Sequence, residues 1–255
     1  MTFDPCAAFR LDDCVAIVTG ASSGLGDRFA RVLHAAGAQV VLAARRLDRL
    51  EQLAAELPGA VAMQCDVSDA DQRVRLIADT IEQLGRIDVL VNNAGIGHKV
   101  KIDDESLELF RDAMEINVTA IWHLSKLTGK HMVAQGGGSI VNIASMLGFV
   151  TAVPVAQAHY TASKGAIINL TRELAAQWAR KGIRVNALCP GWFPSEMTAG
   201  METEEGGLGW VRQNSPMPRL GELHELDGPL LLLASGAGSF MTGTSVVVDG
   251  GWIAR

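Results

Sequence analysis

Short apolar runs alternate with longer amphipathic segments along most of this chain. The runs are rich in Val, Ile, Leu and Ala, as expected for strands that are buried on both faces of a parallel sheet. They lie at residues 14–18, 39–43, 61–65, 87–91, 139–143, 183–188 and 245–248. Between them the hydrophobic pattern has helical spacing and predicts helices over 27–36, 47–57, 69–84, 104–134 (one helix or two), 160–180 and 223–234.

This alternation of strands and helices predicts the fold. Such a chain forms a parallel sheet joined by right-handed crossovers. We therefore expect an α/β protein with a single Rossmann-type, doubly wound parallel sheet of about seven strands and helices on both faces. The 255 residues fit one large domain, and no repeat or linker indicates a second one.

One segment, residues 191–220, interrupts the alternation. It is rich in Gly, Pro and Met, and it is long for a connection in a compact domain, which is typical of a lid or of disorder. Its apolar residues either line the inner side of a lid or only pack the segment onto the body. They are Phe193, Met197, Met201, Leu208, Trp210 and Met217.

Composition limits the possible locations and partners. No apolar run approaches the roughly 18 residues of a membrane span, and residues 1–10 lack the basic and apolar regions of a secretion signal. The net charge of −6 argues against nucleic acid as the main partner. The six histidines show no metal-ligand spacing, so we expect no metal. The cysteines form no C-x-x-C pair and indicate reduced thiols in the cytoplasm; they are Cys6, Cys14, Cys65 and Cys189.

The turn after the first predicted strand is the strongest candidate site. Its sequence is Thr19-Gly20-Ala21-Ser22-Ser23-Gly24-Leu25-Gly26. A strand, a glycine turn and a helix start together bind phosphate, because the backbone amides can approach the anion and the helix N-terminus carries partial positive charge. The spacing is looser than G-x-G-x-x-G, so the turn by itself is also compatible with a purely structural role.

Further motifs follow in a fixed order. Asn92-Asn93-Ala94-Gly95 closes the fourth predicted strand, Ser145 follows the fifth, Tyr160-Thr161-Ala162-Ser163-Lys164 opens a helix, and Pro190-Gly191 closes the sixth strand. With the glycine turn, they resemble the short-chain dehydrogenase/reductase family over roughly residues 11–251. Members that reduce 3-oxoacyl thioesters or oxidise gluconate are similar. The resemblance implies one NAD(P)-binding Rossmann-fold oxidoreductase domain, residues 1–255, with 191–220 as the substrate-binding flap.

The resemblance also implies a catalytic set of Asn117, Ser145, Tyr160 and Lys164. Ser145 would polarise the substrate carbonyl, Tyr160 would transfer the proton, and Lys164 would tune Tyr160 and bind ribose hydroxyls. The backbone carbonyl of Asn117 would hold a water of the proton relay. Position alone makes Ser145 a turn residue and Asn117 a helix interruption. The interval from Gly148 to Tyr160 is slightly longer than usual, which would reshape the substrate mouth.

Tyr160 and Lys164 are four residues apart, so a helix places them on one face. A phenol with a pKa near 10 is a poor acid–base catalyst at neutral pH. A nearby ammonium stabilises the phenolate, so we expect Lys164 to lower the pKa of Tyr160, and an oxidised nicotinamide would add to this effect. Such pairs also occur on exposed helix faces. His159 either edges the cleft or caps and packs the helix.

The cofactor residues follow from the same resemblance. Asp66 would contact the adenine edge, although its position also suits an N-cap of the next helix, as do Ser68 and Asp69. The Phe193 backbone and the Ser195 hydroxyl would hold the carboxamide and diphosphate. The complete predicted set is Gly20, Ser22, Ser23, Gly24, Leu25, Gly26, Arg45, Asp66, Val67, Asn93, Ala94, Gly95, Tyr160, Lys164, Pro190, Gly191, Phe193 and Ser195.

The end of the second predicted strand indicates which dinucleotide is preferred. An acidic residue there accepts a hydrogen bond from the ribose 2′-hydroxyl of NAD, whereas an arginine nearby accommodates the 2′-phosphate of NADP. Here Ala44 takes the acidic position and Arg45-Arg46 follow. We expect NADP to be preferred and NAD to be possible, with Ser22 as a further hydroxyl. Alternatively, the arginines only begin a solvated helix.

The sequence therefore predicts an NAD(P)-dependent oxidoreductase that interconverts a ketone and a secondary alcohol. A 3-oxoacyl thioester, a sugar acid and a hydrophobic cyclic ketone stay open as substrates. The alternative is a catalytically silent dinucleotide-binding regulator or scaffold. We expect no nucleic-acid or membrane partner. The resemblance implies a homotetramer that pairs the helices near 104–134 and 160–180, where Trp122, Leu127 and Trp178 face either an interface or the core.

Overall fold

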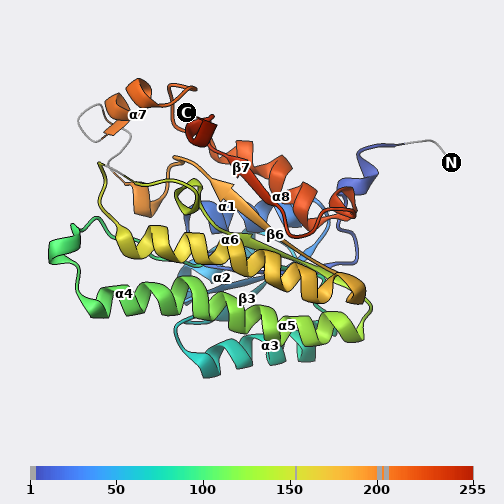
Figure 1. The fold of residues 1–255 in the computed structure, drawn as a ribbon. Coiled ribbons are helices and arrows are strands. Elements are labelled where there is room, and N and C mark those ends of the chain that lie inside the picture. Colours follow the sequence, from blue (N-terminus) through green and yellow to red (C-terminus); the bar gives the residue numbers. More distant parts are fainter. Residues whose placement is uncertain (1–3, 153, 200–202, 204–206, 255) are drawn as a thin grey trace.

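Seven strands of the described residues form one parallel sheet, in the order β3-β2-β1-β4-β5-β6-β7 (Figure 1). The computed structural model describes residues 4–152, 154–199, 203 and 207–254. The order confirms the predicted doubly wound Rossmann-type sheet. The strands are β1 (Val15–Thr19), β2 (Gln39–Ala44), β3 (Val61–Gln64), β4 (Val89–Asn92), β5 (Gly138–Ile143), β6 (Ile183–Pro190) and β7 (Ser245–Val248).

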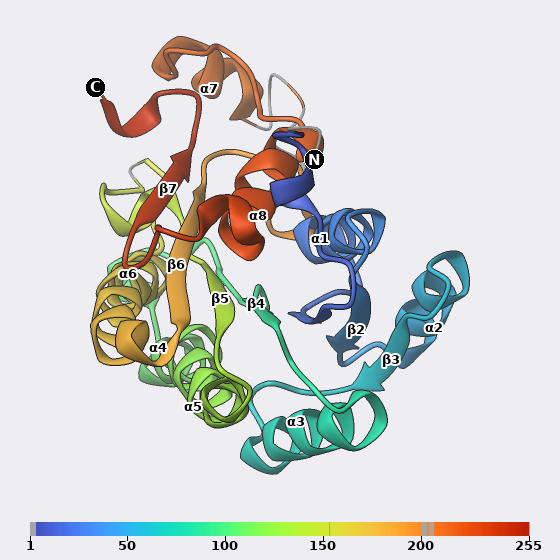
Figure 2. The same cartoon turned by 90° about the vertical axis from the view of Figure 1, so that its right-hand side faces the viewer.

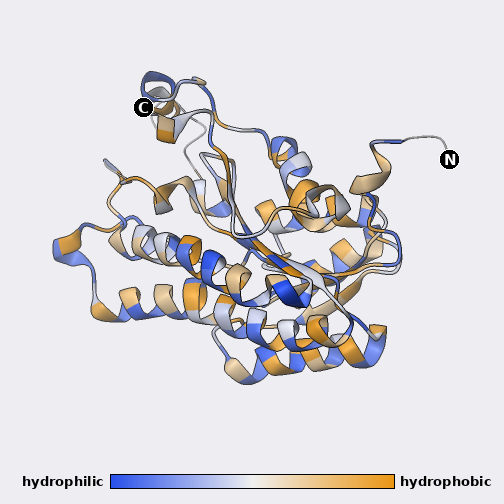
Figure 3. Cartoon of the chain, turned by 45° about the vertical axis from the view of Figure 1, so that its right-hand side comes forward, coloured by the Kyte–Doolittle hydropathy of each residue, from blue (hydrophilic) through white to orange (hydrophobic). Residues whose placement is uncertain are grey.

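Helices cover both faces of the sheet, with α1, α2 and α8 on one face and α3, α4, α5 and α6 on the other (Figure 2). They carry hydrophobic and hydrophilic residues around the same turns (Figure 3), as expected for helices that bury one side. The helices are α1 (Gly24–Ala35), α2 (Leu47–Glu56), α3 (Ala70–Leu84), α4 (Leu107–Met114), α5 (Ala120–Ala134), α6 (Ala158–Trp178), α7 (Gly209–Asn214) and α8 (Asp227–Ala234).

The core lies in two layers because successive side chains of a strand point to opposite faces of the sheet. In β1, Ala16 and Val18 pack toward α1 and α8, whereas Val15 and Ile17 pack toward α3 and α5. Every residue of β1 is buried. This two-sided burial explains why the strands appear in the sequence as continuous apolar runs.

Several elements differ from their predicted bounds for local reasons. Helix α1 begins at Gly24, three residues before the predicted start, because the last glycines of the turn already form its first turn. The predicted helix over 104–134 is divided into α4 and α5 by a π-helical segment, Glu115–Thr119. Strand β6 extends to Pro190 because it pairs with β7 up to that residue.

The flap segment, which we define as residues 191–220, contains a single turn at Glu196–Thr198 and the short helix α7. Trp210 of α7 packs against Trp192 and Trp252, with ring centroids 5.7 and 4.9 Å away, and those two rings lie 5.6 Å apart. This tryptophan cluster joins the end of β6, the flap segment and the C-terminal turn. Met201 lies outside the described residues.

Candidate active site

The glycine turn has the geometry that its residues require. Gly20 and Gly24 have φ angles of 67° and 55°, which L side chains rarely adopt. A Cβ on Gly26 would lie 2.2 Å from the Gly20 carbonyl oxygen, so only glycine allows α1 to start this close to β1. The turn thus leaves a backbone-lined cradle at the N-terminus of a 12-residue helix, which is a favourable site for phosphate.

A hydrogen-bonded crossing holds β1 and β4 together at the point where the strand order reverses. The Thr19 hydroxyl accepts from the backbone N–H groups of Asn93 (3.0 Å) and Ala94 (3.1 Å). The Asn93 side-chain amide donates to the Thr19 carbonyl oxygen at 2.9 Å. Open α/β sheets bind ligands in the crevice at such a reversal.

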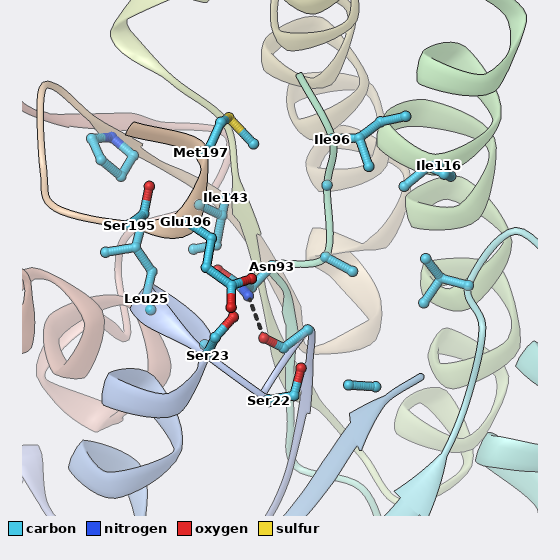
Figure 4. Close-up of a pocket in the computed structure, with 18 of the residues that line it drawn as sticks. Ser22, Ser23, Leu25, Asn93, Ile96, Ile116, Ile143, Ser195, Glu196 and Met197 are labelled. Atoms are coloured by element: carbon cyan, nitrogen blue, oxygen red, sulfur yellow. Dashed lines mark hydrogen bonds between the residues drawn. The ribbon is translucent and has the colours of Figure 1, made fainter. Parts of the chain in front are cut away.

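A cleft of about 310 Å³ occupies this crevice, and part of its lining is shown in Figure 4. Every residue predicted to hold the cofactor lines it, and Ser145 lines it as well. Asn117 lies behind the wall and is fully buried. Further lining residues lie outside the predicted cofactor set; they are Ala44, Arg46, Cys65, Ile96, Ile116, Ile143, Ala144, Glu196, Met197 and Thr198. Among them, the sequence points to Ala44 and Arg46 at the end of the second predicted strand and to Met197 in the flap segment.

Ser145, Tyr160 and Lys164 meet at the inner end of the cleft. Ser145 follows β5 and its hydroxyl accepts from the Leu147 N–H at 3.1 Å. Tyr160 and Lys164 come from the first turns of α6, and the Lys164 Nζ lies 5.4 Å from the centroid of the phenol ring. Nζ donates to the Ile143 carbonyl oxygen at 2.7 Å. Strand β5 and helix α6 therefore bring the three side chains together.

Burial dominates the acid–base properties of this group. It raises the pKa of Tyr160 to about 12, against a smaller lowering by a hydrogen bond with Ser145. It also lowers the pKa of Lys164 to about 8. The prediction that Lys164 lowers the pKa of Tyr160 is wrong for the protein alone, because desolvation of the phenolate outweighs any stabilisation by the ammonium.

The π-helical segment aims the side chain of Asn117 at the loop after β4. Its Oδ1 accepts from the Ile96 N–H at 2.8 Å, and its Nδ2 donates to the Ile96 carbonyl oxygen at 2.8 Å. Nδ2 also donates to the Ser163 hydroxyl at 2.9 Å, which in turn donates to the Tyr160 carbonyl oxygen at 2.8 Å. Asn117 thus ties the floor of the cleft to the helix that carries Tyr160.

The two arginines after β2 have different surroundings. Arg46 donates to the Ser22 hydroxyl from Nε (3.1 Å) and from Nη2 (3.0 Å), and Nη2 donates to the Ser23 hydroxyl at 2.8 Å. Arg45 lines the cleft and makes no ion pair with any residue that the structure describes. The sequence predicts Arg45 and not Arg46 as a cofactor residue, because no sequence pattern shows the contacts of Arg46 with Ser22 and Ser23.

The structure shows whether Asp66 caps helix α3 or lines the cleft. Helix α3 is capped by Asp69, whose carboxylate accepts from the N–H groups of Asp71 and Gln72. Asp66 instead accepts from the N–H and hydroxyl of Ser68, at 2.9 and 2.8 Å, and lines the cleft. The capping role proposed as the alternative for Asp66 is therefore wrong.

His159, next to Tyr160, packs inside the protein. Its ring is fully buried and its Nδ1 bonds to the buried Glu105 carboxylate. Its Nε2 accepts from the His98 backbone N–H at 3.0 Å, so Nδ1 carries the proton that is donated to Glu105. This chain of bonds fixes the loop after β4 against the start of α6.

Comparison with known proteins identifies the family to which the chain belongs. Residues 20–253 match the family model described as Enoyl-(Acyl carrier protein) reductase. The chain is 42% identical to galactitol 2-dehydrogenase (L-tagatose-forming) of Cereibacter sphaeroides, over 96% of both chains. It is 37% identical to gluconate 5-dehydrogenase of Gluconobacter oxydans, over 95% of this chain and 96% of that one. The crystal structure of a gluconate 5-dehydrogenase from Burkholderia cenocepacia in complex with NADP and tartrate is 33% identical, with a TM-score of 0.93 over 99% of this chain and 100% of that one.

The chain belongs to the short-chain dehydrogenase/reductase family. It is an NAD(P)-dependent oxidoreductase that acts on secondary alcohols and ketones, as predicted. The comparisons give no support to the catalytically silent regulator. Within the described residues, no three His, Cys, Asp or Glu side chains are grouped in a way that could hold a metal ion. No helix among them is both long and apolar enough to span a membrane.

Proposed function

We propose that this protein is an NADP(H)-preferring enzyme that interconverts a polyol and a ketose. Residues 1–255 act as one domain, with the flap segment over the substrate. The observation that carries the reaction is the meeting of Ser145, Tyr160 and Lys164 at the inner end of a cleft that suits a dinucleotide. That cleft fits the cofactor because three glycines leave a cradle without side chains, and serine and arginine donors surround it.

The chain's own residues then divide the work of the reaction. Ser145 donates a hydrogen bond to the substrate carbonyl oxygen, and Tyr160 gives that oxygen its proton in reduction or takes it back in oxidation. Lys164 holds positive charge beside the phenol and donates to ribose hydroxyls. The backbone carbonyl of Asn117 holds a water that supplies the proton. When bound, the nicotinamide supplies the hydride-transfer chemistry.

The lining near Tyr160 favours an uncharged substrate. Ile96, Ile143 and Met197 are apolar lining residues, and the described lining has one lysine, Lys164, beside Tyr160. The two arginines of this lining, Arg45 and Arg46, follow β2. A sugar acid would bring a carboxylate without a second cation to meet it. The 42% identity with galactitol 2-dehydrogenase supports a polyol. The apolar side chains also support a second candidate, a hydrophobic cyclic ketone.

A substrate panel tests this proposal. Initial rates with both cofactors would be measured on galactitol, sorbitol and xylitol, on gluconate, and on a cyclic alcohol and its ketone. We expect the highest kcat/KM among the polyols and at least about tenfold less for gluconate. A preference for gluconate would refute the uncharged substrate, and a preference for the cyclic pair would favour the second candidate.

Preference for NADP(H) is supported by the end of β2. Ala44 leaves no carboxylate to repel a 2′-phosphate, and Arg45 has no described ion-pair partner. We expect the wild type to bind NADPH more tightly than NADH. Arg45→Ala should weaken NADPH binding by about tenfold or more and change NADH binding little. Arg180→Ala, at an exposed arginine beyond the end of α6, serves as the control. Equal affinities of the wild type for both cofactors would refute the preference.

We also propose a cytoplasmic homotetramer. All four cysteines are unpaired, which suits a reducing compartment. Leu127 and Trp178 pack into the protomer core, but Trp122 on α5 is 43% exposed and Phe240 before β7 is fully exposed. These two side chains lie where α5 and the C-terminal strand would meet partner subunits. Light scattering at micromolar concentration should give about four times 27.1 kDa, and a monomer mass would refute the assembly.

A further inference from the structure

The arginine that faces the glycine turn already holds an anion from its own chain. Glu196, in the single turn of the flap segment, accepts from Arg46 Nη1 at 2.9 Å and from Nη2 at 3.1 Å. It also accepts from Arg49 at 3.0 Å. In Figure 4 the Glu196 carboxylate points at Ser23, beside Ser22. One carboxylate thus joins the flap segment to the wall of the cofactor cleft.

The donors around this carboxylate are those that a phosphate monoester uses. Arg46 donates to the Glu196 carboxylate from both terminal nitrogens, and the same guanidinium donates to the hydroxyls of Ser22 and Ser23. Its three nitrogens are therefore all engaged, and a second anion on the same fork would have to replace the first. Two anions beside the same guanidinium would also repel each other. The arrangement is an occupied anion site.

We propose that Glu196 occupies the position of the cofactor's 2′-phosphate, so that NADP(H) displaces it and NAD(H) does not. The inference rests on the NADP(H) preference proposed above. It makes Glu196 a specificity-determining residue that lowers the affinity for NADP(H) by competing for Arg46. The carboxylate is held ready for this exchange, because Arg46 keeps the pKa of Glu196 at about 2 and the side chain stays charged.

Displacement would also release the single turn Glu196–Thr198 of the flap segment. Glu196 lies between Ser195 and Met197, which both line the cleft, and the turn is otherwise held by bonds among Phe193, Ser195 and Thr198. In the described residues the bonds from Arg46 and Arg49 are the ion pairs that tie this turn to the body. Entry of a 2′-phosphate therefore frees the turn next to the substrate mouth.

Binding of fragments that lack the nicotinamide tests the competition without turnover. Calorimetry would compare 2′,5′-ADP with 5′-AMP on the wild type, on Glu196→Gln and on Glu56→Gln. The last variant breaks another exposed arginine–carboxylate pair, with Arg31, outside the cleft. We expect Glu196→Gln to tighten 2′,5′-ADP roughly three- to tenfold and to leave 5′-AMP within about twofold, because exposed pairs are individually weak. Glu56→Gln should change neither affinity.

The outcomes separate this inference from the cofactor preference. If the wild type prefers 2′,5′-ADP and Glu196→Gln leaves that preference unchanged, only the competition is overturned. If neither protein distinguishes the two fragments, the NADP(H) preference and the competition both fail. Equal tightening by Glu56→Gln would assign the effect to net charge and overturn the competition.

Hydrogen exchange gives the second readout. We expect 2′,5′-ADP to speed exchange of the backbone amides of Glu196–Thr198 in the wild type, since the fragment removes the tie and cannot reach the nicotinamide end. The 5′-AMP fragment should leave their exchange unchanged. Slower or unchanged exchange with 2′,5′-ADP would overturn the displacement.

Discussion

Lys164 is 4% exposed, and burial lowers its pKa from 10.5 to about 8. In the unfolded chain its pKa is near 10.4. Between these two values the unfolded state binds a proton that the folded state does not, so stability falls as the pH falls through this window. Each pKa unit corresponds to about 1.4 kcal/mol, so the full loss below pH 8 is about 3 kcal/mol. Lys164→Met removes this pH-dependent loss of stability.

The free energy of unfolding of the wild type and of Lys164→Met would be measured in urea at pH 7 and pH 10, at one protein concentration. The difference between them isolates Lys164, because both proteins keep Tyr160 and every other titrating group. We expect the difference in the free energy of unfolding, wild type minus variant, to rise by about 2.5 kcal/mol from pH 7 to pH 10. Lys130→Met, at an exposed lysine of α5, should show no such change. A difference that does not depend on pH, or one of opposite sign, would refute the burial argument.

Three further predictions concern other parts of the site. Tyr160→Phe should lower kcat by at least about 100-fold, with NADPH affinity within about twofold by fluorescence titration; wild-type turnover would contradict the assigned role. Gly26→Ala should lower the free energy of unfolding by about 1–3 kcal/mol in urea melts, because its Cβ would lie 2.2 Å from a backbone carbonyl oxygen. Gly228→Ala is the control, because nothing lies within 4 Å of a Cβ there, and an equally small change at Gly26 would contradict the prediction. Glu105→Ala should cost roughly 3 kcal/mol, since it leaves two donors of His159 unpaired; an unchanged thermal midpoint would argue against it.

The fold was predictable because its signals are local. Strands buried on both faces appear as unbroken apolar runs, and glycines mark the turn where only glycine fits. Element ends were less predictable, because they depend on tertiary pairing. Strand β6 reaches Pro190 only through β7, and the π-helical segment around Asn117 follows from its bonds to Ile96 and Ser163.

The site was predictable where motifs have fixed spacing and not where distant segments meet. Glu196 lies 150 residues from Arg46, and Glu105 lies 54 residues from His159. No pattern in the sequence connects either pair. The prediction for the pKa of Tyr160 failed for a related reason. The helical spacing shows that Lys164 is near, but the burial that decides the direction of the pKa shift depends on the whole fold.

The tryptophan cluster gives this enzyme an optical signal of its own. Three of the five tryptophans lie in it, and their ring centroids are 4.9 to 5.7 Å apart. Rings this close couple their excited states, so near-ultraviolet circular dichroism and intrinsic emission should respond when α7 leaves the C-terminal turn. Reduced nicotinamide absorbs where tryptophan emits, which adds energy transfer as a second channel. Any change in the contact between α7 and the C-terminal turn can therefore be followed in stopped flow on the unlabelled protein.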